Sequence, residues 1–151
     1  MTRVNFSSEL ERALARPDAD RLTRQVQAYI EHIQGVNDAW PDEVADDFSE
    51  IVMSGLVDPD LALAYTMIAA SITDDEKFLG FMGAGGLEEI LRDPSDELLS
   101  RIVDEARRTA RFRWLLSCPY PHAIAPRAWE AIKDFVTFDA NSSSVPPRPS
   151  A

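Results

Sequence analysis

Two residues of this sequence could form a nucleophilic pair. Cys118 and His122 stand four residues apart in a loop that also contains two prolines, and an imidazole beside a thiol can take its proton to leave a reactive thiolate. No motif supplies a third group to orient the imidazole, and the prolines by themselves indicate only a stiff connection. We therefore predict a protein without catalytic residues, and we keep a Cys118/His122 enzyme as the less favoured alternative.

The sequence contains no pattern typical of a metal or cofactor site. His32 has no second ligand at helical spacing, and the chain has no cluster of cysteine and histidine. The acidic runs at 42–47 and 74–76 lack the central glycine and terminal glutamate of a calcium-binding loop. Carboxylates on an open helix face are rarely catalytic, because nothing there shifts their pKa. We predict no cofactor and no metal.

Four arginines lie close together in the sequence: Arg107, Arg108, Arg111 and Arg113. Two interpretations remain open for them. They could form a basic patch that binds a phosphate, or they could pair with acidic helices elsewhere in the chain. We favour pairing.

The charge of the chain is strongly acidic and unevenly distributed. The formal net charge is −11, and residues 38–97 hold sixteen acidic side chains against two basic ones. Such a surface repels nucleic acid and anionic membranes, so we predict direct binding to neither. It favours a basic protein partner, including enzymes that themselves bind nucleic acid.

One amphipathic helix, predicted for residues 41–54, carries the most distinctive acidic surface. Its apolar stripe contains Val44, Phe48, Ile51 and Val52. The opposite face is acidic, which is typical either of a simple solvated surface or of a docking face for a basic partner. The candidate partner-binding residues are Asp42, Glu43, Asp46, Asp47 and Glu50.

The elements that position these residues are all predicted to be helices. Residues 59–72 are apolar on all sides, which predicts a buried central helix, with Asp58 as its N-cap. Further helices are predicted at 18–36, from Pro94 (capped by Asp93) to 109, at 110–117 and from 126. Because no stretch alternates with a period of two, we predict an all-α fold. It would be a compact bundle of antiparallel helical hairpins with six to eight helices and a slight solenoid character.

A glycine-rich segment links two of these helical patterns. Gly83, Gly85 and Gly86 can take positive φ, which predicts a sharp reversal of the chain, and they also allow two helix backbones to approach closely. A phosphate-binding turn is the alternative. It is disfavoured because Glu88 and Glu89 follow at the positions where an anion would bind.

The ends of the sequence set the expected domain and compartment. We predict a single helical domain over 1–140 and a disordered Ser/Pro-rich tail over 141–151, because the tail has no core residues. The N-terminal residues lack the apolar run of a signal peptide, and the single cysteine, Cys118, cannot form an internal disulfide. A cytoplasmic location is expected.

Part of the chain resembles a family of small bacterial all-helical proteins of unassigned function. That family has a Leu-Gly…Ala-Gly-x-Leu-Glu-x-Leu-Leu core and a later Phe-Arg-x-x-Leu segment. The matching residues here are 79–91 and 111–116, and Trp40-Pro41 matches an earlier aromatic position. Gly83 stands where the family pattern has a small alanine. The resemblance implies special polar positions at Glu88 and at Arg113 (or Arg111), which we expect to form a partly buried ion pair.

The functional prediction is a non-enzymatic acidic binding protein. Its concrete form would be an immunity protein for a toxin, or an inhibitor of a nucleic-acid-handling enzyme, which docks the acidic helix face on the basic partner. The alternative is a regulatory or scaffold helical domain in a larger complex, using an apolar or Arg-lined groove. Binding in that case would depend weakly on salt and would respond to changes at Trp114, Tyr120 or Trp129.

Overall fold

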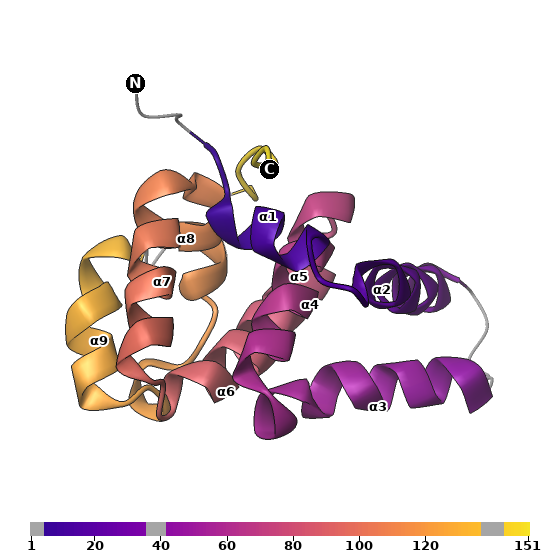
Figure 1. Ribbon diagram of the computed structural model, residues 1–151, viewed down its shortest axis with the longest axis horizontal. Helices are drawn as coiled ribbons and strands as arrows, with labels where there is room; N and C mark the ends of the chain where they lie inside the picture. Colours follow the sequence, from indigo (N-terminus) through magenta and orange to yellow (C-terminus); the bar gives the residue numbers. More distant parts are fainter. Residues whose placement is uncertain (1–4, 36–41, 137–143) are drawn as a thin grey trace.

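The computed structural model describes residues 5–35, 42–136 and 144–151, and these residues form an all-α fold (Figure 1). Because α5, η1 and α6 run on without a break, the described residues contain eight separate α-helices, which confirms the predicted all-α bundle. The elements are α1 (Ser8–Leu14), α2 (Ala19–Gln34), α3 (Asp42–Val57), α4 (Pro59–Ile72), α5 (Glu76–Met82), the π-helical η1 (Gly83–Leu87), α6 (Glu88–Leu91), α7 (Asp96–Arg108), α8 (Ala110–Leu116), the 3-10 helix η2 (Pro121–Ala123), α9 (Pro126–Ile132) and the 3-10 helix η3 (Lys133–Phe135).

Helix α4 lies at the centre of the fold, as its apolar sequence predicted. Residues 62–70 are all buried, and α1, α2, α3, α5 and η1 pack around them. Figure 1 shows α2 and α3 on one side of α4 and the group α7, α8 and α9 on the other. Asp58 is the N-cap, as predicted, because its carboxylate accepts a hydrogen bond from the backbone N–H of Asp60 at 3.0 Å.

The predicted reversal at the glycine-rich segment is wrong. Among the described residues no glycine has positive φ, and 83–87 form a π-helical turn that joins α5 to α6 in one long helix. The glycines instead allow close packing. A Cβ on Gly83 would lie 2.7 Å from the carbonyl oxygen of Leu115, and one on Gly86 would lie 3.0 Å from Oγ1 of Thr66. A Cβ on Gly85 would meet nothing within 4 Å, so packing does not require glycine there.

The start of α7 also differs from the prediction. Ser95, and not Asp93, is the N-cap, because the Ser95 hydroxyl accepts a hydrogen bond from the backbone N–H of Leu98 at 3.1 Å. The first helical residue is Asp96, two residues after Pro94. Either Asp or Ser can cap a helix. Ser95 does so here, directly after the buried Pro94.

The C-terminal segment 144–151 packs against the protein, which differs from the disorder expected for 141–151; residues 141–143 lie outside the described part. The carbonyl oxygen of Ser150 accepts a hydrogen bond from Ser7 N–H at 2.8 Å, and Ser150 N–H donates to the carbonyl of Asn5 at 3.1 Å. Arg111 donates from Nε to the carbonyl of Pro146 at 2.8 Å. Figure 1 shows this segment beside the start of α1. These backbone contacts leave no trace in the composition of the tail.

Candidate functional site

The N-terminal half of α3 presents an exposed group of carboxylates. Asp42, Glu43 and Asp46 are all exposed, and the first two lie in the first turn of the helix. Acidic residues there complement the positive end of the helix dipole, which favours a helix at this place. Pro41 and Trp40, which the sequence analysis also singled out, lie outside the described residues. These three side chains are thus exposed, as docking on a partner would require, and their role in binding stays a prediction.

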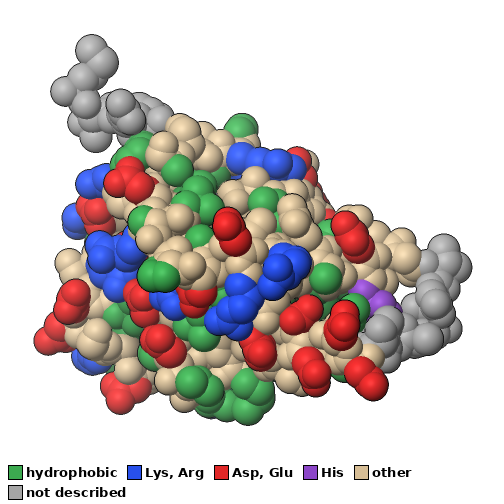
Figure 2. Space-filling model, turned by 45° about the vertical axis from the view of Figure 1, so that its right-hand side comes forward, with side chains coloured by type: hydrophobic (Ala, Val, Ile, Leu, Met, Phe, Trp, Pro, Cys, Tyr) green, Lys and Arg blue, Asp and Glu red, His purple; other side chains and the backbone are tan. Residues whose placement is uncertain are grey.

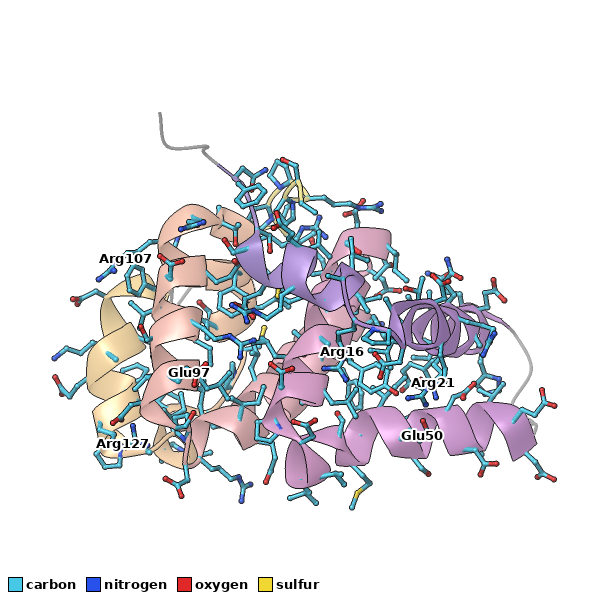
Figure 3. All side chains as sticks on the ribbon, viewed as in Figure 1. Arg16, Arg21, Glu50, Glu97, Arg107 and Arg127 are labelled. Atoms are coloured by element: carbon cyan, nitrogen blue, oxygen red, sulfur yellow. The ribbon has the colours of Figure 1, made fainter. Side chains whose placement is uncertain are left out.

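The other two predicted partner-binding residues, Asp47 and Glu50, contact α2. The buried Gln25 donates from Nε2 to Glu50 at 2.6 Å and to Asp47 at 3.2 Å. Arg21 adds an ion pair to Glu50 at 3.1 Å, and Figure 3 shows these two side chains meeting between α2 and α3. Because these contacts hold α3 against α2, Asp47 and Glu50 stabilise the fold. The Glu50 side chain is still about half exposed.

Gln25 connects this contact to the core. Its Oε1 accepts a hydrogen bond at 2.6 Å from the hydroxyl of Tyr65, which lies buried on α4. Burial, followed by the nearby charge of Glu50, raises the pKa of Tyr65 to about 12, so the hydroxyl stays protonated and donates. The position of α3 is therefore set by a polar chain that begins at the central helix.

The C-terminal half of α3 presents an apolar surface. The predicted burial of Val52 is wrong, and the helix continues past the predicted end near Ser54 to Val57. Figure 2 shows hydrophobic side chains gathered at the lower edge of the molecule. The junction of α3 and α4 lies at the same height in Figure 1. The large apolar residues exposed on α3 are Val52 (45%), Met53 (49%), Leu56 (63%) and Val57 (79%).

An open apolar groove separates this part of α3 from the long helix of α5, η1 and α6. Its volume is about 340 Å³, and we call it the α3 groove. One side consists of Ile51, Val52, Met53 and Leu56, and the other includes Phe81, Met82 and residues 84–86 of η1. Glu88, Glu89 and Arg92 line the groove as well, so its margin is polar.

Glycines and aromatic rings shape the α3 groove. A Cβ on Gly55 would lie 2.8 Å from Cγ of Glu89, so α3 can approach α6 only with glycine at this position. Gly85 and Gly86 line the groove without side chains. At one side, the half-exposed ring of Phe81 has its centroid 6.3 Å from that of Phe48 on α3. The groove is thus bounded by packed elements at both sides.

The predicted ion pair between Glu88 and Arg113 is wrong. Glu88 accepts a hydrogen bond from the backbone N–H of Tyr120 at 3.1 Å, and Arg113 donates to the carbonyl of Ala106 at 2.7 Å. Both side chains satisfy backbone groups, which compete with an ion pair for the same polar atoms. The sequence motif placed the two residues in one family pattern but contained no information about their distance.

Arg111 is the buried arginine of this region, with 2% of its surface exposed. It donates to the carbonyl oxygens of Ala70 at 2.7 Å and Thr73 at 3.0 Å, at the C-terminal end of α4. Asp74 pairs with it and is mostly exposed. Arg111 therefore satisfies carbonyls that a helix end leaves without intrahelical donors. An arginine in segment 110–116, whose other residues apart from Arg113 are apolar, was the available signal.

The other arginines do not form a phosphate-binding patch with Arg111. Arg108 donates to the hydroxyl of Ser8 at 2.6 Å and pairs with Asp104 at 3.2 Å. Arg107 lies exposed at the outer side of α7 (Figure 3). Arg111 pairs with the distant Asp74, whereas Arg108 pairs within its own helix and Arg113 donates to a carbonyl. Pairing with acidic residues elsewhere in the chain, the favoured interpretation, therefore holds for Arg111 and not for the group as a whole.

Cys118 and His122 have surroundings unsuited to a nucleophilic pair. The thiol of Cys118 donates a hydrogen bond to the carbonyl of Trp114 at 3.6 Å. Burial raises the pKa of this thiol to about 11, so it is protonated at neutral pH. The ring of His122 lies at the surface, 5.8 Å from the ring of Tyr120. Neither group is thus prepared for nucleophilic attack.

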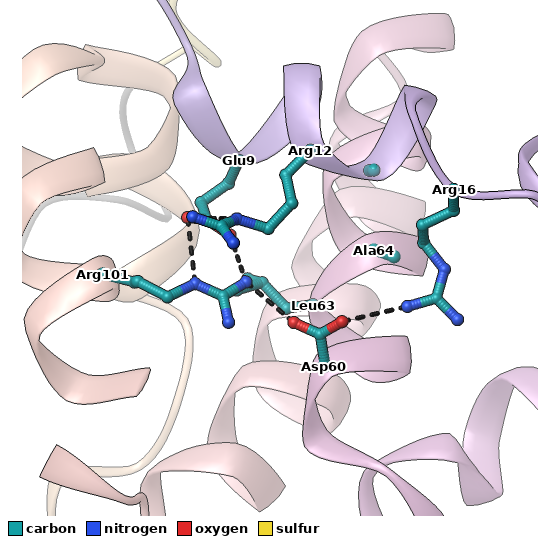
Figure 4. A pocket seen from close by; sticks show the side chains of 8 residues that line it. Glu9, Arg12, Arg16, Asp60, Leu63, Ala64 and Arg101 are labelled. Atoms are coloured by element: carbon teal, nitrogen blue, oxygen red, sulfur yellow. Dashed lines mark hydrogen bonds and ion pairs between the residues drawn. The ribbon is translucent and has the colours of Figure 1, made fainter. Parts of the chain in front are cut away.

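A network of ion pairs, which the sequence did not predict, joins α1, α4 and α7 (Figure 4). Arg101 binds Glu9 through two nitrogens, at 2.6 and 3.2 Å, and pairs with Asp60 at 2.8 Å. Asp60 also pairs with Arg16 at 3.0 Å. The hydrogen bonds that Arg101 donates to the Glu9 carboxylate raise the pKa of Arg101 further above its ordinary value. The cavity beside the network measures only about 10 Å³, so the ion-paired side chains themselves fill the space there.

Metal centres and membrane spans are two further classes of site that residues 5–35, 42–136 and 144–151 could contain. In these ranges, no group of three or more His, Cys, Asp or Glu side chains is placed to hold a metal ion. In the same ranges, no helix combines the length and apolarity needed to cross a membrane. The α3 surface, with its exposed carboxylates and its groove, is the candidate binding site.

The α3 surface lies within the part of the chain that matches a known protein family. No curated protein and no solved structure matches the chain. A family model described as a family of unknown function (DUF6869) matches residues 36–139, a range that includes α3, the α3 groove, η1 and Arg111. This agrees with the resemblance to a family of unassigned function. The match extends over more than half of the sequence, and the chain belongs to this family.

Proposed function

We propose that this protein is a non-enzymatic binding protein that docks α3 on a basic protein partner. The observation that carries the proposal is the division of α3 into an exposed acidic half and an exposed apolar half. Asp42, Glu43 and Asp46 would meet the basic surface of the partner. Asp47 and Glu50, which already hold α2, contribute charge to the same side of the molecule.

The physical basis is electrostatic complementarity. A chain with a net charge of −11 attracts a basic partner over some distance, which increases the association rate and makes it sensitive to salt. A toxin or a nucleic-acid-handling enzyme has a groove that binds phosphates, and carboxylates can occupy such a groove or lie beside it. An immunity or inhibitor protein is the concrete form we propose, with the cytoplasm as its compartment.

A second candidate is a regulatory or scaffold domain in a larger complex. The α3 groove favours it, because monomeric proteins rarely expose contiguous apolar surface without a binding role. The groove lies between α3 and η1. Of the three aromatic residues predicted for this alternative, Trp114 is buried, Trp129 is partly buried and Tyr120 is exposed. Binding through the groove alone would depend weakly on salt, and this dependence separates the two candidates.

The test is a charge reversal that spares the contacts to α2. The variant Asp42→Lys, Glu43→Lys, Asp46→Lys changes the charge by +6 and leaves Asp47 and Glu50 in place. In pull-downs from the host at low and high salt, we expect it to lose the partner that the wild type captures. Affinity should fall by about 100-fold or more, because like charges across an interface cost several kcal/mol.

A matched control distinguishes the acidic face from total charge. The variant Asp96→Lys, Glu97→Lys, Glu130→Lys makes the same change in charge at exposed positions and also alters the first turn of a helix, α7. It should keep the partner. Circular dichroism should show unchanged helix content for both variants. If the α3 variant binds as the wild type does, the proposed docking face is refuted.

A further inference from the structure

We propose that the α3 groove receives the apolar side of a basic amphipathic helix, carried by the partner that the acidic half of α3 attracts. The inference rests on the proposed function and specifies what the partner inserts. Three features of the groove support it: the exposure of its apolar walls, the arrangement of the helices that form it, and the charge around it.

The first feature is the exposure of large apolar side chains along the groove. Val52, Met53 and Leu56 on one wall and Phe81 on the other are each more than 40% exposed. A methionine adapts its shape to an incoming side chain better than a branched residue does. The walls therefore offer apolar surface that water covers in the free protein. A ligand that buried this surface would be bound more tightly, because removing apolar surface from water is favourable.

The second feature is the shape of the groove. Its walls are α3 and the long helix through η1, and Gly85 and Gly86 leave the η1 part of the second wall without large side chains. Amphipathic helices bind in grooves of this kind by placing apolar residues at positions i, i+3, i+4 and i+7. The π-helical turn at 83–87 widens the helix at the groove, a feature that often accompanies binding sites.

The third feature is charge, which decides between possible occupants. A second copy of this chain would bring its own −11 and its own Asp42, Glu43 and Asp46 to the same surface, so repulsion opposes self-association. Glu88 and Glu89 at the groove add negative charge, partly offset by the Arg92 ion pair with Glu89 at 3.3 Å. A helix with lysines or arginines beside its apolar stripe complements both halves of α3.

The experiment uses the full chain and a synthetic helix as the probe. The probe is a fluorescent peptide of about 18 residues, long enough to form a helix, with leucines at i, i+3, i+4 and i+7 and lysines elsewhere. Two peptides serve as references: one has the same composition in scrambled order, and one has glutamate in place of lysine. Fluorescence anisotropy measures affinity, and chemical-shift changes locate the contact. We expect shifts at Met53, Leu56 and Phe81.

Two matched variants test the groove itself. Met53→Asp with Leu56→Asp changes the apolar wall, whereas Leu14→Asp with Ile33→Asp changes two exposed apolar residues elsewhere. Both variants add two negative charges, so both should attract a lysine peptide more strongly if charge alone mattered. We expect affinity to fall by at least about tenfold for the groove variant and by less than about twofold for the control.

Several outcomes would overturn the inference. They are equal affinity of the two variants, equal affinity for the scrambled peptide, or a concentration-dependent dimer in analytical ultracentrifugation that the groove variant abolishes. The two proposals also fail separately. The variant with Asp42, Glu43 and Asp46 reversed tests the attraction of a basic partner. The Met53→Asp, Leu56→Asp variant keeps those carboxylates and tests only the insertion of apolar side chains.

Discussion

Gly83 lies at the point where α5 passes into η1, against the backbone of α8. A Cβ at this position would lie 2.7 Å from the carbonyl oxygen of Leu115 and 3.0 Å from Cβ of Cys118. We predict that Gly83→Ala lowers the free energy of unfolding by about 1–3 kcal/mol, because backbone must move to make room. Urea denaturation followed by circular dichroism measures the change.

Gly80 provides the control for this substitution. It lies three residues earlier in the same continuous helix, and a Cβ there would meet nothing within 4 Å. Gly80→Ala should therefore raise the free energy of unfolding by about 0.5–1 kcal/mol, the usual gain from replacing a helical glycine. If both alanine variants shift the free energy of unfolding in the same direction, the close approach of η1 to α8 does not require glycine at position 83.

The sequence predicted the roles of some single residues and not of others. Asp58 could be identified as an N-cap because capping depends on the few residues that follow it. Asp93 has the same local pattern, yet Ser95 is the N-cap of α7, because the local pattern does not decide between two residues that can both cap a helix. The glycines at 83 and 86 were correctly singled out, but their function depends on helices distant in sequence.

At the scale of elements, apolar periodicity predicted most helices and the central place of α4. It failed at two points where tertiary contacts override local signals. The Ser54-Gly55 dipeptide resembles a helix end, yet α3 continues to Val57, and Gly55 lies close against the side chain of Glu89. The glycine-rich segment resembles a turn, yet it stays helical. The apolar half of the candidate site follows from these two departures, so the sequence predicted only the acidic half.

Arg111 joins three elements: it caps the end of α4, lies on α8 and holds the C-terminal segment through Pro146. We predict that Arg111→Met lowers the free energy of unfolding, by about 1–3 kcal/mol for each buried carbonyl that loses its hydrogen-bond donor. Urea denaturation gives the total change. Hydrogen exchange should also show faster exchange of the Ser7 amide, whose acceptor is the carbonyl of Ser150.

The comparison for Arg111 is Arg107→Met. Arg107 is exposed on α7, so its replacement removes the same charge and nearly the same volume without leaving a buried carbonyl unpaired. Its effect on stability should stay within about 0.5 kcal/mol, as for most surface substitutions. Similar effects of the two substitutions would show that charge, and not the capping of α4, accounts for the role of Arg111.

At the scale of the whole molecule, helix count and class followed from the sequence, whereas the long-range polar contacts did not. Glu9, Asp60 and Arg101 belong to three helices, and each looks like an ordinary surface charge in its own helix. Ion pairing across such distances in sequence depends on how the helices are placed. Periodicity specifies which face of a helix is buried and does not specify its neighbour.

Two carboxylates should give the stability of the protein opposite responses to pH. Burial raises the pKa of Glu105, which accepts a hydrogen bond from the hydroxyl of Ser7. Its stabilising effect is fully present below the ordinary pKa of 4.5 and is lost as pH rises through the raised value. Hydrogen bonds from Arg148 and Arg111 lower the pKa of Asp74, so its contribution exists above 3.8 and is lost as pH falls.

Urea denaturation over a pH series measures both effects. Relative to Glu105→Gln, the wild type should lose stability as pH rises from about 4.5 to 7, by no more than about 1.4 kcal/mol per pH unit. Relative to Asp74→Asn, the wild type should lose stability as pH falls below 3.8. A pH-independent difference for either pair would show that the carboxylate concerned has the same pKa in the folded and unfolded states.

The parallel bridge between Phe6 and Ser150 brings the two ends of the described chain together. Figure 1 places them at the upper edge of the molecule, whereas α3 runs along the lower edge. An affinity tag or a fluorescent fusion attached at either end would therefore extend away from the α3 groove. The same geometry would let the molecule be tethered to a sensor chip or a bead by both ends at once while α3 faces the solution.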